Sequence, residues 1–453
     1  MTPSYSFGRR GFLQVAGAGV LGTALPKAGR AAEVSPRAKS VVIVWCSGGP
    51  SQFETFDPKP HAPAEIRGEF SAIGTAVPGV FVGEHLPRLA QTLDRWSIVR
   101  TLAHKEYNHL LATHVALTGR PTPVPRGGSD LDRVQSRSDF PNFAAALDYV
   151  RPRKDGVPSG VSLPNYFIEG PLTWPGQYAG FLGVRHDPWQ INQDPNSADF
   201  KVDELALPTG MSNERLSSRQ RLLTGLGPDR EHTLAGRASS FGEQQELAFS
   251  LLTSARVTKA FDVKAEPTEV RDRYGRNKFG QSLLLTRRLV EASVPIVQAA
   301  MGGVQTWDTH VDNWGKLKNT LLPQLDQGLL ALMDDLTTSG RIRETMVIVM
   351  GEFGRTPKIS TLPGESVPGR DHWPNVYSAL FAGAGIRGGQ VIGESDSIAA
   401  YPLSRSWDPA DICTTIFEAL GVPEHAELLD PLGRPNRLLN GEVIAPLYTG
   451  AAT

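Results

Sequence analysis

The sequence predicts an α/β fold in which a mostly parallel sheet is covered by helices on both faces. Short apolar runs rich in β-branched residues occur at 40–46, 296–300 and 345–350, with the sequences SVVIVWC, IVQAA and TMVIVM. Continuous apolar runs of this length are typical of strands that are buried on both faces. Segments with apolar residues at helical spacing separate the runs, and this alternation favours parallel strands joined by helices.

In the N-terminal part, the first strand is followed by SGGP, as expected of a buried strand that ends in a loop. We expect a helix at 86–93, a second strand at 96–100 and a helix at 110–117. Asn108 is a suitable cap for the start of the last helix, and Gly119 should end it.

Residues 121–240 are rich in Pro, Gly, Ser and Asp, which favours loops and small elements. We interpret this region as a loop-rich cap inserted over the core and not as a second independent domain. A helix is expected to follow at 243–261. Residues 33–450 are therefore predicted to form one large α/β domain.

Regular structure returns in the C-terminal half. A long amphipathic helix is expected at 313–339, where leucines recur at intervals of three and four. Pro323 should bend this helix and Gly340 should end it, and Asp408 is a candidate cap for a late helix. The other strands and helices of this half are expected at 279–292, 296–300, 345–350, 376–382 and 409–420.

The first 32 residues have the pattern of a removable export signal. Arg9-Arg10 precedes Gly-Phe-Leu, a mildly apolar run follows at 15–25, and Gly-Arg-Ala at 29–31 offers small residues for cleavage. The run is about half of the ~20 residues that cross a bilayer, and no other segment reaches that length. We expect export by the twin-arginine machinery to the periplasm or the exterior, with no membrane span.

The net charge and the two cysteines limit the classes of protein to which this chain can belong. The formal net charge is −1, and loss of the signal, with its four basic and no acidic residues, would make it −5. This balance lacks the basic footprint of a nucleic-acid-binding protein. Cys46 ends an apolar strand and Cys413 lies in an apolar helical stretch, so we expect two buried thiols and no disulfide.

Acidic, basic and imidazole side chains adjoin the predicted strands at the edge where α/β folds bind their ligands. A carboxylate and an imidazole separated by one residue, as in WDTH, can share a metal ion or form an acid–base pair. Each residue alone also has a structural explanation, as a turn residue, a buried imidazole or an ion pair. The candidates at this edge are Asp308, His310, Glu352, Arg355, Arg370, Asp371 and His372.

Two earlier segments add further candidates. The loop SGGPSQFETFDPKP contains Glu54 and Asp57, and its glycines let backbone amides approach an anion. His109 and His114 lie near the start of the helix at 110–117. Because these groups recur at successive strand ends, we expect a shared site and not a set of unrelated turns.

Several stretches resemble the exported bacterial family known as domain of unknown function 1501. They are GGPSQFETFDPKP, NHLLATHVALTGR, WDTHVDN, GEFGRTP and GRDHWPNVYSALFAGAGIRGG, and they span about residues 40–420. The family is itself similar to the alkaline phosphatase/sulfatase superfamily, so the resemblance implies an alkaline-phosphatase-like core. It also implies a divalent metal site. The ligands it implies are Asp308, His310 and His372, with Asp371, Glu54 and Asp57 as further candidates.

The sequence departs from that superfamily in ways that favour a single or altered metal site. His109 stands near the place of the nucleophile, where relatives have Ser, Thr or Cys, and the formylglycine motif Cys-x-Pro-x-Arg is absent from the sequence. Phe353 stands where a metal-binding His is expected, next to Glu352. Imidazole and carboxylate ligands together suit zinc, manganese or iron.

Two functions fit these observations. The first is an exported metal-dependent hydrolase of phosphate or sulfate esters, acting on an envelope or extracellular glycan. Arg355 and Arg370 would then hold the anion, and Glu352 or His109 would be the general base. The second is a non-catalytic envelope protein that keeps the fold and binds an anionic glycan or a protein partner.

Overall fold

The computed structural model describes residues 35–122, 136–202, 214, 215, 218, 222 and 254–450 of the 453-residue chain. The predicted export signal and residues 243–253 of a predicted helix lie outside them. From Pro36 onward the chain clusters as one compact unit. Its centre is an eight-stranded sheet in the order β14-β4-β13-β10-β1-β9-β5-β8. These strands are β1 (Ser40–Trp45), β4 (Ser97–Leu102), β5 (Gly160–Leu163), β8 (Trp189–Gln190), β9 (Ile296–Ala300), β10 (Thr345–Met350), β13 (Tyr377–Ala382) and β14 (Gln390–Ile392).

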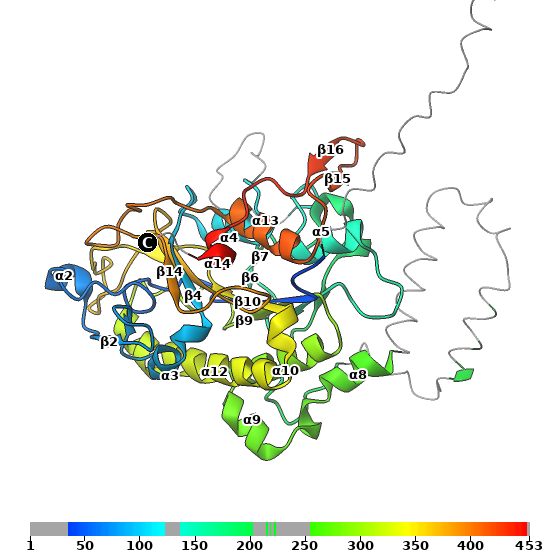
Figure 1. Cartoon of the computed structure of the whole chain (residues 1–453), viewed down its shortest axis with the longest axis horizontal. Coiled ribbons are helices and arrows are strands. Elements are labelled where there is room, and N and C mark those ends of the chain that lie inside the picture. The colour runs from blue at the N-terminus through cyan, green and yellow to red at the C-terminus, as the bar shows by residue number, and fades with distance from the viewer. Residues whose placement is uncertain are drawn as a thin grey trace, which may run out of the picture. The chain divides into compact units, whose positions relative to one another are not determined.

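Helices cover both faces of the sheet, as predicted (Figure 1). One layer contains α3 (Pro87–Gln91), α8 (Ala255–Phe261), α9 (Thr268–Tyr274), α10 (Lys278–Glu291) and α12 (Leu322–Thr338). The other contains α4 (His109–Thr118), α5 (Phe143–Val150), α13 (Pro409–Ala419) and α14 (Pro446–Thr449). Short helices are α2 (Ala64–Arg67) and α11 (Asn313–Lys316). Two-stranded ladders pair β2 (Ala72–Gly74) with β3 (Phe81–Gly83), β6 (Ile168–Glu169) with β7 (Leu172–Thr173), β11 (Gly354–Arg355) with β12 (His372–Trp373), and β15 (Glu427–Leu429) with β16 (Pro435–Arg437).

The central strand β1 shows why its sequence is apolar throughout. Val42 and Val44 pack into the core beneath one face, whereas Val41, Ile43 and Trp45 pack into the core beneath the other. All five side chains are buried because both faces carry helices. The apolar run at 40–46 was therefore a correct signal for a central strand.

One strand, β13, runs against the others. It pairs antiparallel with both β10 and β4. The other strands of this sheet all run in one direction; they are β1, β4, β5, β8, β9, β10 and β14. The start of β13 therefore lies at the same sheet edge as the carboxyl ends of the parallel strands. Because of this reversal, the segment just before β13 meets the loops that follow the parallel strands.

The region expected to be a cap also contributes to the sheet. Within 121–240, β5 pairs with β9 and β8 pairs with β5, so these residues extend the sheet at one edge. Helix α5 packs against β5 as well. Loops dominate the described residues between 164 and 188. The composition indicated loops correctly but did not reveal two short edge strands.

The predicted long helix is interrupted near its proline. After α11, residues Leu317–Leu321 form a π-helical turn, and α12 begins at Leu322 with Pro323 in its first turn. The Leu322 N–H bonds the carbonyl of Leu317, five residues back. A proline cannot donate a backbone hydrogen bond, and a π-helical turn is one way to accommodate it. Gly340, at φ +71°, follows the end of α12 as expected.

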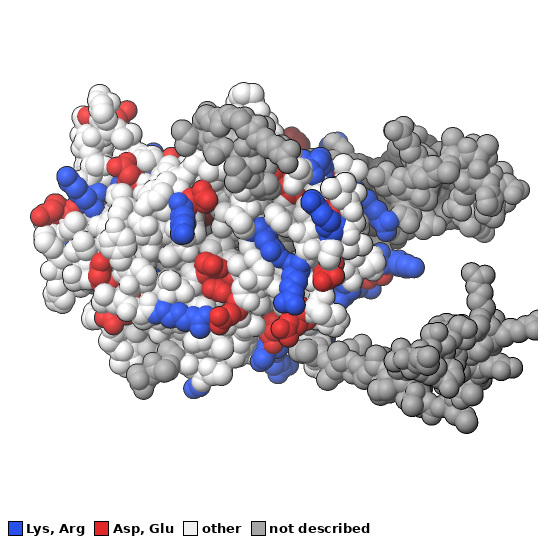
Figure 2. Space-filling view, turned by 90° about the horizontal axis from the view of Figure 1, so that it is seen from above, with Lys and Arg blue, Asp and Glu red and all other residues white. Residues whose placement is uncertain are grey.

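The predicted helix caps and buried thiols are confirmed. The Asn108 side chain accepts from Leu110 N, and Asp408 caps α13 in a capping box. Cys46 and Cys413 are both free and buried. None of the helices in the described ranges combines the length and apolarity needed to cross a membrane. On the face shown in Figure 2, acidic and basic side chains of the described residues lie interspersed.

Candidate metal centre

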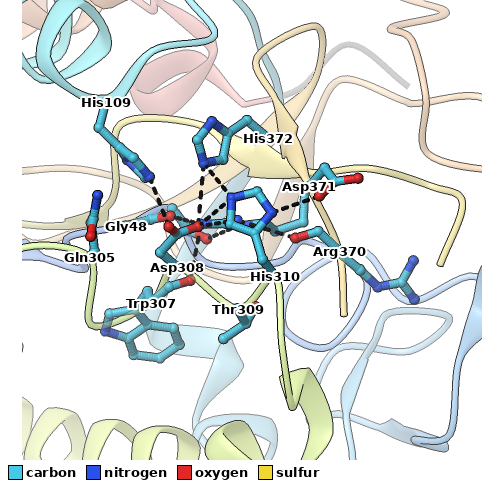
Figure 3. A network of polar contacts seen from close by, with 12 residues as sticks. Gly48, His109, Gln305, Trp307, Asp308, Thr309, His310, Arg370, Asp371 and His372 are labelled. Carbon is cyan, nitrogen blue, oxygen red and sulfur yellow. Dashed lines mark hydrogen bonds and ion pairs between the residues drawn. The ribbon is translucent and has the colours of Figure 1, made fainter. Parts of the chain in front are cut away.

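Four segments that are distant in sequence meet at one edge of the sheet (Figure 3). The loop after β9 supplies Asp308 and His310, and the loop after β10 supplies Glu352. His372 lies on β12, just before β13, and His109 is the first residue of α4. The convergence expected from the sequence is therefore observed, and the antiparallel β13 explains how His372 reaches the other groups.

The loops approach one another too closely for side chains at two glycines. Gly48 has φ +111°, and a Cβ there would lie 2.4 Å from the backbone nitrogen of Asp308. A Cβ at Gly369 would lie 2.2 Å from the carbonyl oxygens of Thr309 and His310. Glycine at both positions lets the backbone pack directly against the 308–310 loop.

Asp308 is the centre of the cluster. Its Oδ1 lies 2.6 Å from Arg355 Nη1, 3.1 Å from His310 Nε2 and 3.3 Å from His372 Nε2, and its Oδ2 lies 3.3 Å from His109 Nε2. Burial raises the pKa of Asp308, but the three imidazoles and the guanidinium outweigh burial and hold it well below its usual range. Asp308 is therefore a carboxylate at neutral pH.

The outward nitrogens of two imidazoles are fixed by acceptors. His310 Nδ1 lies 2.6 Å from Asp371 Oδ1, and His372 Nδ1 lies 2.7 Å from the Tyr107 carbonyl oxygen. A carboxylate and a carbonyl can only accept, so each Nδ1 carries the proton. In the neutral tautomer, each Nε2 then has a lone pair that faces Asp308.

His109 is oriented in the same way. Its Nδ1 lies 2.7 Å from Glu352 Oε1, an atom that also accepts from Gly48 N at 2.8 Å. The side chain of Glu352 is fully buried. His109 Nε2 is buried and is directed at Asp308 Oδ2, 3.3 Å away. The contacts with Asp308 and Glu352 raise the pKa of His109 against the opposing effect of burial.

Three imidazole nitrogens thus converge on one carboxylate, and two of them touch. His310 Nε2 and His372 Nε2 lie 2.9 Å apart. Two lone pairs at this distance repel, and either a proton on one ring or a bound cation removes the repulsion. The hydrogen bond to Asp308 raises the pKa of His310, whereas burial lowers that of His372.

The donor set fits a divalent transition metal. One ligand atom each of His109, Asp308 and His372 lies within 4.8 Å of the others. His310 Nε2 adjoins this group through its contacts with His372 and Asp308. Imidazole nitrogens with a carboxylate suit zinc, manganese or iron. Carboxylate or carbonyl partners on the outer nitrogens are the arrangement that orients metal-ligating histidines.

Aromatic rings hold the imidazoles from the sides. Trp174 stacks on His109 with ring centroids 5.4 Å apart. Phe353 packs against His109 at 4.9 Å and against His372 at 4.6 Å. Phe353 stands where the resemblance suggested a metal-binding His, and it supplies packing instead of a ligand.

Arg355 is committed to the protein and does not fit the role of anion holder. Its side chain is fully buried, and it donates to the carbonyls of Gly48, Gly49 and Trp307 besides its ion pair with Asp308. Burial lowers its pKa, against the effect of Asp308. The guanidinium fixes the loop after β1 to Asp308, so the sequence-based expectation for Arg355 is corrected.

Arg370 and Glu54 form a second buried unit behind the site. Arg370 Nη2 donates to Glu54 Oε1 at 2.8 Å, and its guanidinium lies over the rings of Phe53 at 4.2 Å and Trp314 at 5.6 Å. Both side chains of the ion pair are at most 1% exposed. Figure 3 shows Arg370 pointing away from the imidazoles. Arg370 is therefore not placed to hold an anion, and Glu54 is not a ligand of this cluster.

Asp57 is also excluded from the cluster by its contacts. It forms ion pairs with Lys59 at 3.1 Å and Arg100 at 3.4 Å, and it accepts from Ser395. The structure thus brings together most of the predicted ligands but separates the two acids of the first loop. Asp371 contacts His310 and so orients a ligand nitrogen.

Sequence reasoning placed His109 among the catalytic residues and not among the ligands. The Asn108 cap was a usable indication of where His109 lies, because it fixes His109 in the first turn of α4. The carbonyl of Tyr107 and the amide of Gly48, which hold His372 and Glu352, carry no signal in the sequence.

Solved structures resemble the chain at low identity. A PsFucS1 sulfatase from Pseudoalteromonas sp. has 11% identity and a TM-score of 0.41, covering 85% of this chain and 68% of its own. A phosphonate monoester hydrolase of Agrobacterium radiobacter has 12% identity and a TM-score of 0.37, with 92% and 78% covered. A protein in the alkaline phosphatase superfamily from Vibrio parahaemolyticus has 12% identity and a TM-score of 0.35, with 85% and 67% covered.

No match was found among curated proteins. A family model matches nearly the whole described chain, from residue 38 to residue 448. Its description is "Protein of unknown function (DUF1501)", and the chain belongs to this family.

Proposed function

We propose that the chain is an exported metal-dependent hydrolase of phosphate or sulfate esters that acts on envelope or extracellular glycans. The observation that carries the proposal is the convergence of three imidazole Nε2 atoms on the carboxylate of Asp308. Lone pairs directed at a common point in a partly buried site are arranged for a cation.

Asp308, His310 and His372 are the ligands that the sequence suggests, whereas the ligand atoms that lie mutually close belong to His109, Asp308 and His372. A divalent ion bound here would polarise the ester and offset the negative charge that develops in hydrolysis. The chain's own groups prepare the site for this chemistry. Asp371 keeps the Nδ1 proton of His310, so that His310 Nε2 stays directed at Asp308.

Glu352 acts on His109 and not on the substrate in this proposal. Its buried Oε1 holds the Nδ1 proton of His109, which leaves Nε2 able to bind the cation or to accept a proton from water. Glu352 is therefore a positioning residue. In its role as general base, His109 would take a proton from a water molecule, and that water would attack the ester in place of the hydroxyl or thiol nucleophile.

A non-catalytic function is favoured by two observations. His109 occupies the motif position of the nucleophile, and Arg355 and Arg370, the arginines beside the cluster, are buried and bonded to the protein. A protein with this site could bind an anionic glycan or a partner through the metal without turnover. Activity measurements separate the two functions.

The test combines elemental analysis of the purified protein with a panel of phosphate and sulfate monoesters and diesters. The hydrolase proposal expects one divalent ion per chain and hydrolysis of at least one ester class, both lost in Asp308→Asn. His186→Gln alters an imidazole–carboxylate pair outside the cluster and should change neither. Metal without turnover on any ester would favour the non-catalytic function. Absence of metal would refute both the metal-dependent hydrolase and a non-catalytic protein that binds its ligand through the metal.

Export is tested separately. Replacing Arg9 and Arg10 by lysines should leave the precursor in the cytoplasm, because the twin-arginine machinery reads this pair. The wild-type precursor is the control. Normal export of the double variant would refute the proposed route without affecting the site.

A further inference from the structure

Three aromatic side chains form a partly exposed cluster beside the metal centre, which we call the aromatic rim: Tyr107, Trp373 and Tyr401. The ring centroids of Tyr107 and Trp373 are 6.4 Å apart, and those of Trp373 and Tyr401 are 5.7 Å apart, both edge to face. Tyr107 is 47% exposed and Tyr401 is 53% exposed. Large aromatic surfaces in water are costly and often mark a binding site.

The aromatic rim is tied directly to a proposed metal ligand. The carbonyl of Tyr107 holds His372 Nδ1, and Trp373 follows His372 in β12. Trp373 Nε1 donates to the Ala400 carbonyl at 2.6 Å, which fixes the indole to the segment that carries Tyr401. The aromatic rim is therefore built on the same backbone segments that carry and orient His372.

Polar groups and a cavity adjoin the rim. Asn375 Nδ2 donates to the Tyr107 hydroxyl at 2.6 Å. Asn375 and Tyr401 both line a cavity of about 590 Å³, together with Lys105 and Arg120. This volume lies in the range of about 300–1,000 Å³ that is typical of small-ligand sites. The cavity thus combines aromatic, amide, basic and acidic side chains, the acids being Glu106 and Asp408.

We propose that the aromatic rim and this cavity bind the sugar rings that carry the ester. A pyranose has an apolar C–H face that packs on an aromatic ring, and hydroxyls at its edge that bond to amides such as Asn375. The charged side chains that line the cavity, Lys105, Arg120, Glu106 and Asp408, offer further donors and acceptors to sugar hydroxyls.

The presence of an ester on the bound sugar rests on the proposed function, whereas the binding of the sugar rings does not depend on it. The test therefore measures sugar binding without catalysis. The probes are soluble hexasaccharides of a β-linked glucan, a galactan and an amino-sugar polymer, each with and without sulfate groups. Binding is followed by calorimetry and by quenching of tryptophan fluorescence, to which Trp373 contributes as one of eight tryptophans.

We expect at least one unsulfated hexasaccharide to bind the wild-type protein and the inactive Asp308→Asn variant equally. Tyr107→Ala combined with Tyr401→Ala should weaken binding by about tenfold or more. Tyr107→Phe keeps the ring and should retain most of the binding. Phe81→Ala removes a comparably exposed ring, 45% exposed, from another part of the surface and is the matched control.

Equal binding by the double variant and the wild type, or no binding of any hexasaccharide, would overturn the inference. Weakened binding by Phe81→Ala to the same extent would also overturn it, because the effect would not be specific to the rim. If sugar binds but no ester is hydrolysed, the rim stands and the hydrolase proposal fails.

Discussion

His310 Nε2 and His372 Nε2 lie 2.9 Å apart, and both are directed at Oδ1 of Asp308. The other nitrogen of each ring is held by an acceptor, Asp371 or the Tyr107 carbonyl. Two neutral imidazoles do not hold this geometry without a positive charge between or on them. The relationship therefore links the geometry of this sheet edge to a positive charge at the two rings, supplied by a proton or by a bound cation.

Metal removal should destabilise the protein. We expect chelator to lower the melting temperature of the wild type, since a ligand present at about 100 times its Kd contributes about 2.7 kcal/mol. His310→Ala should start with less metal and a lower melting temperature, and chelator should change it little further. Calorimetry with and without chelator measures both effects. A wild-type melting curve that chelator leaves unchanged would identify the cluster as a polar network.

Glu352→Gln should weaken metal binding while the fold remains intact. The neutral amide no longer attracts the Nδ1 proton of His109 as a carboxylate does, and loss of such a partner typically costs about 10- to 100-fold in affinity. Metal titration measures the affinity, and circular dichroism checks the fold. Glu169→Gln, which changes a carboxylate that contacts Gln305, should leave the affinity unchanged. Unchanged affinity in Glu352→Gln would show that the pair with His109 is only structural.

Glu54→Gln should destabilise the whole domain and not only the site. The substitution leaves the buried guanidinium of Arg370 without its charged partner, at a cost of about 3–5 kcal/mol. Denaturant unfolding measures the difference. The partly exposed pair of Arg95 and Asp334 offers a control, because Asp334→Asn should cost less than about 1 kcal/mol. Similar losses in the two variants would contradict a special role for the buried pair.

The two thiols should be inert in the folded protein. Burial raises the pKa of Cys413 to about 12 and raises that of Cys46 even further above its usual value. The reactive thiolate is therefore almost absent at pH 8. A thiol reagent should modify neither cysteine before unfolding and both after unfolding in denaturant. Rapid modification of either one in the native protein would show that its burial is incomplete in solution.

The sequence by itself determined the central strands, the helix caps and most of the residues that gather at the sheet edge. Apolar runs such as 40–46 predict buried strands because the pattern of apolar and β-branched residues is a local property of the sequence. Asn108 and Asp408 specify helix starts for the same reason, since a cap bonds amides two or three residues away.

Only the tertiary structure decided how those residues meet. The reversal of β13 brings His372 to Asp308, and it depends on pairing with β4 and β10 far along the chain. The same long-range packing commits Arg355 and Arg370 to the interior, where a motif suggested anion binding. The partners that fix each imidazole lie up to 265 residues away. Such contacts leave no periodic pattern in the sequence, so the charge balance of the site appears only in the folded chain.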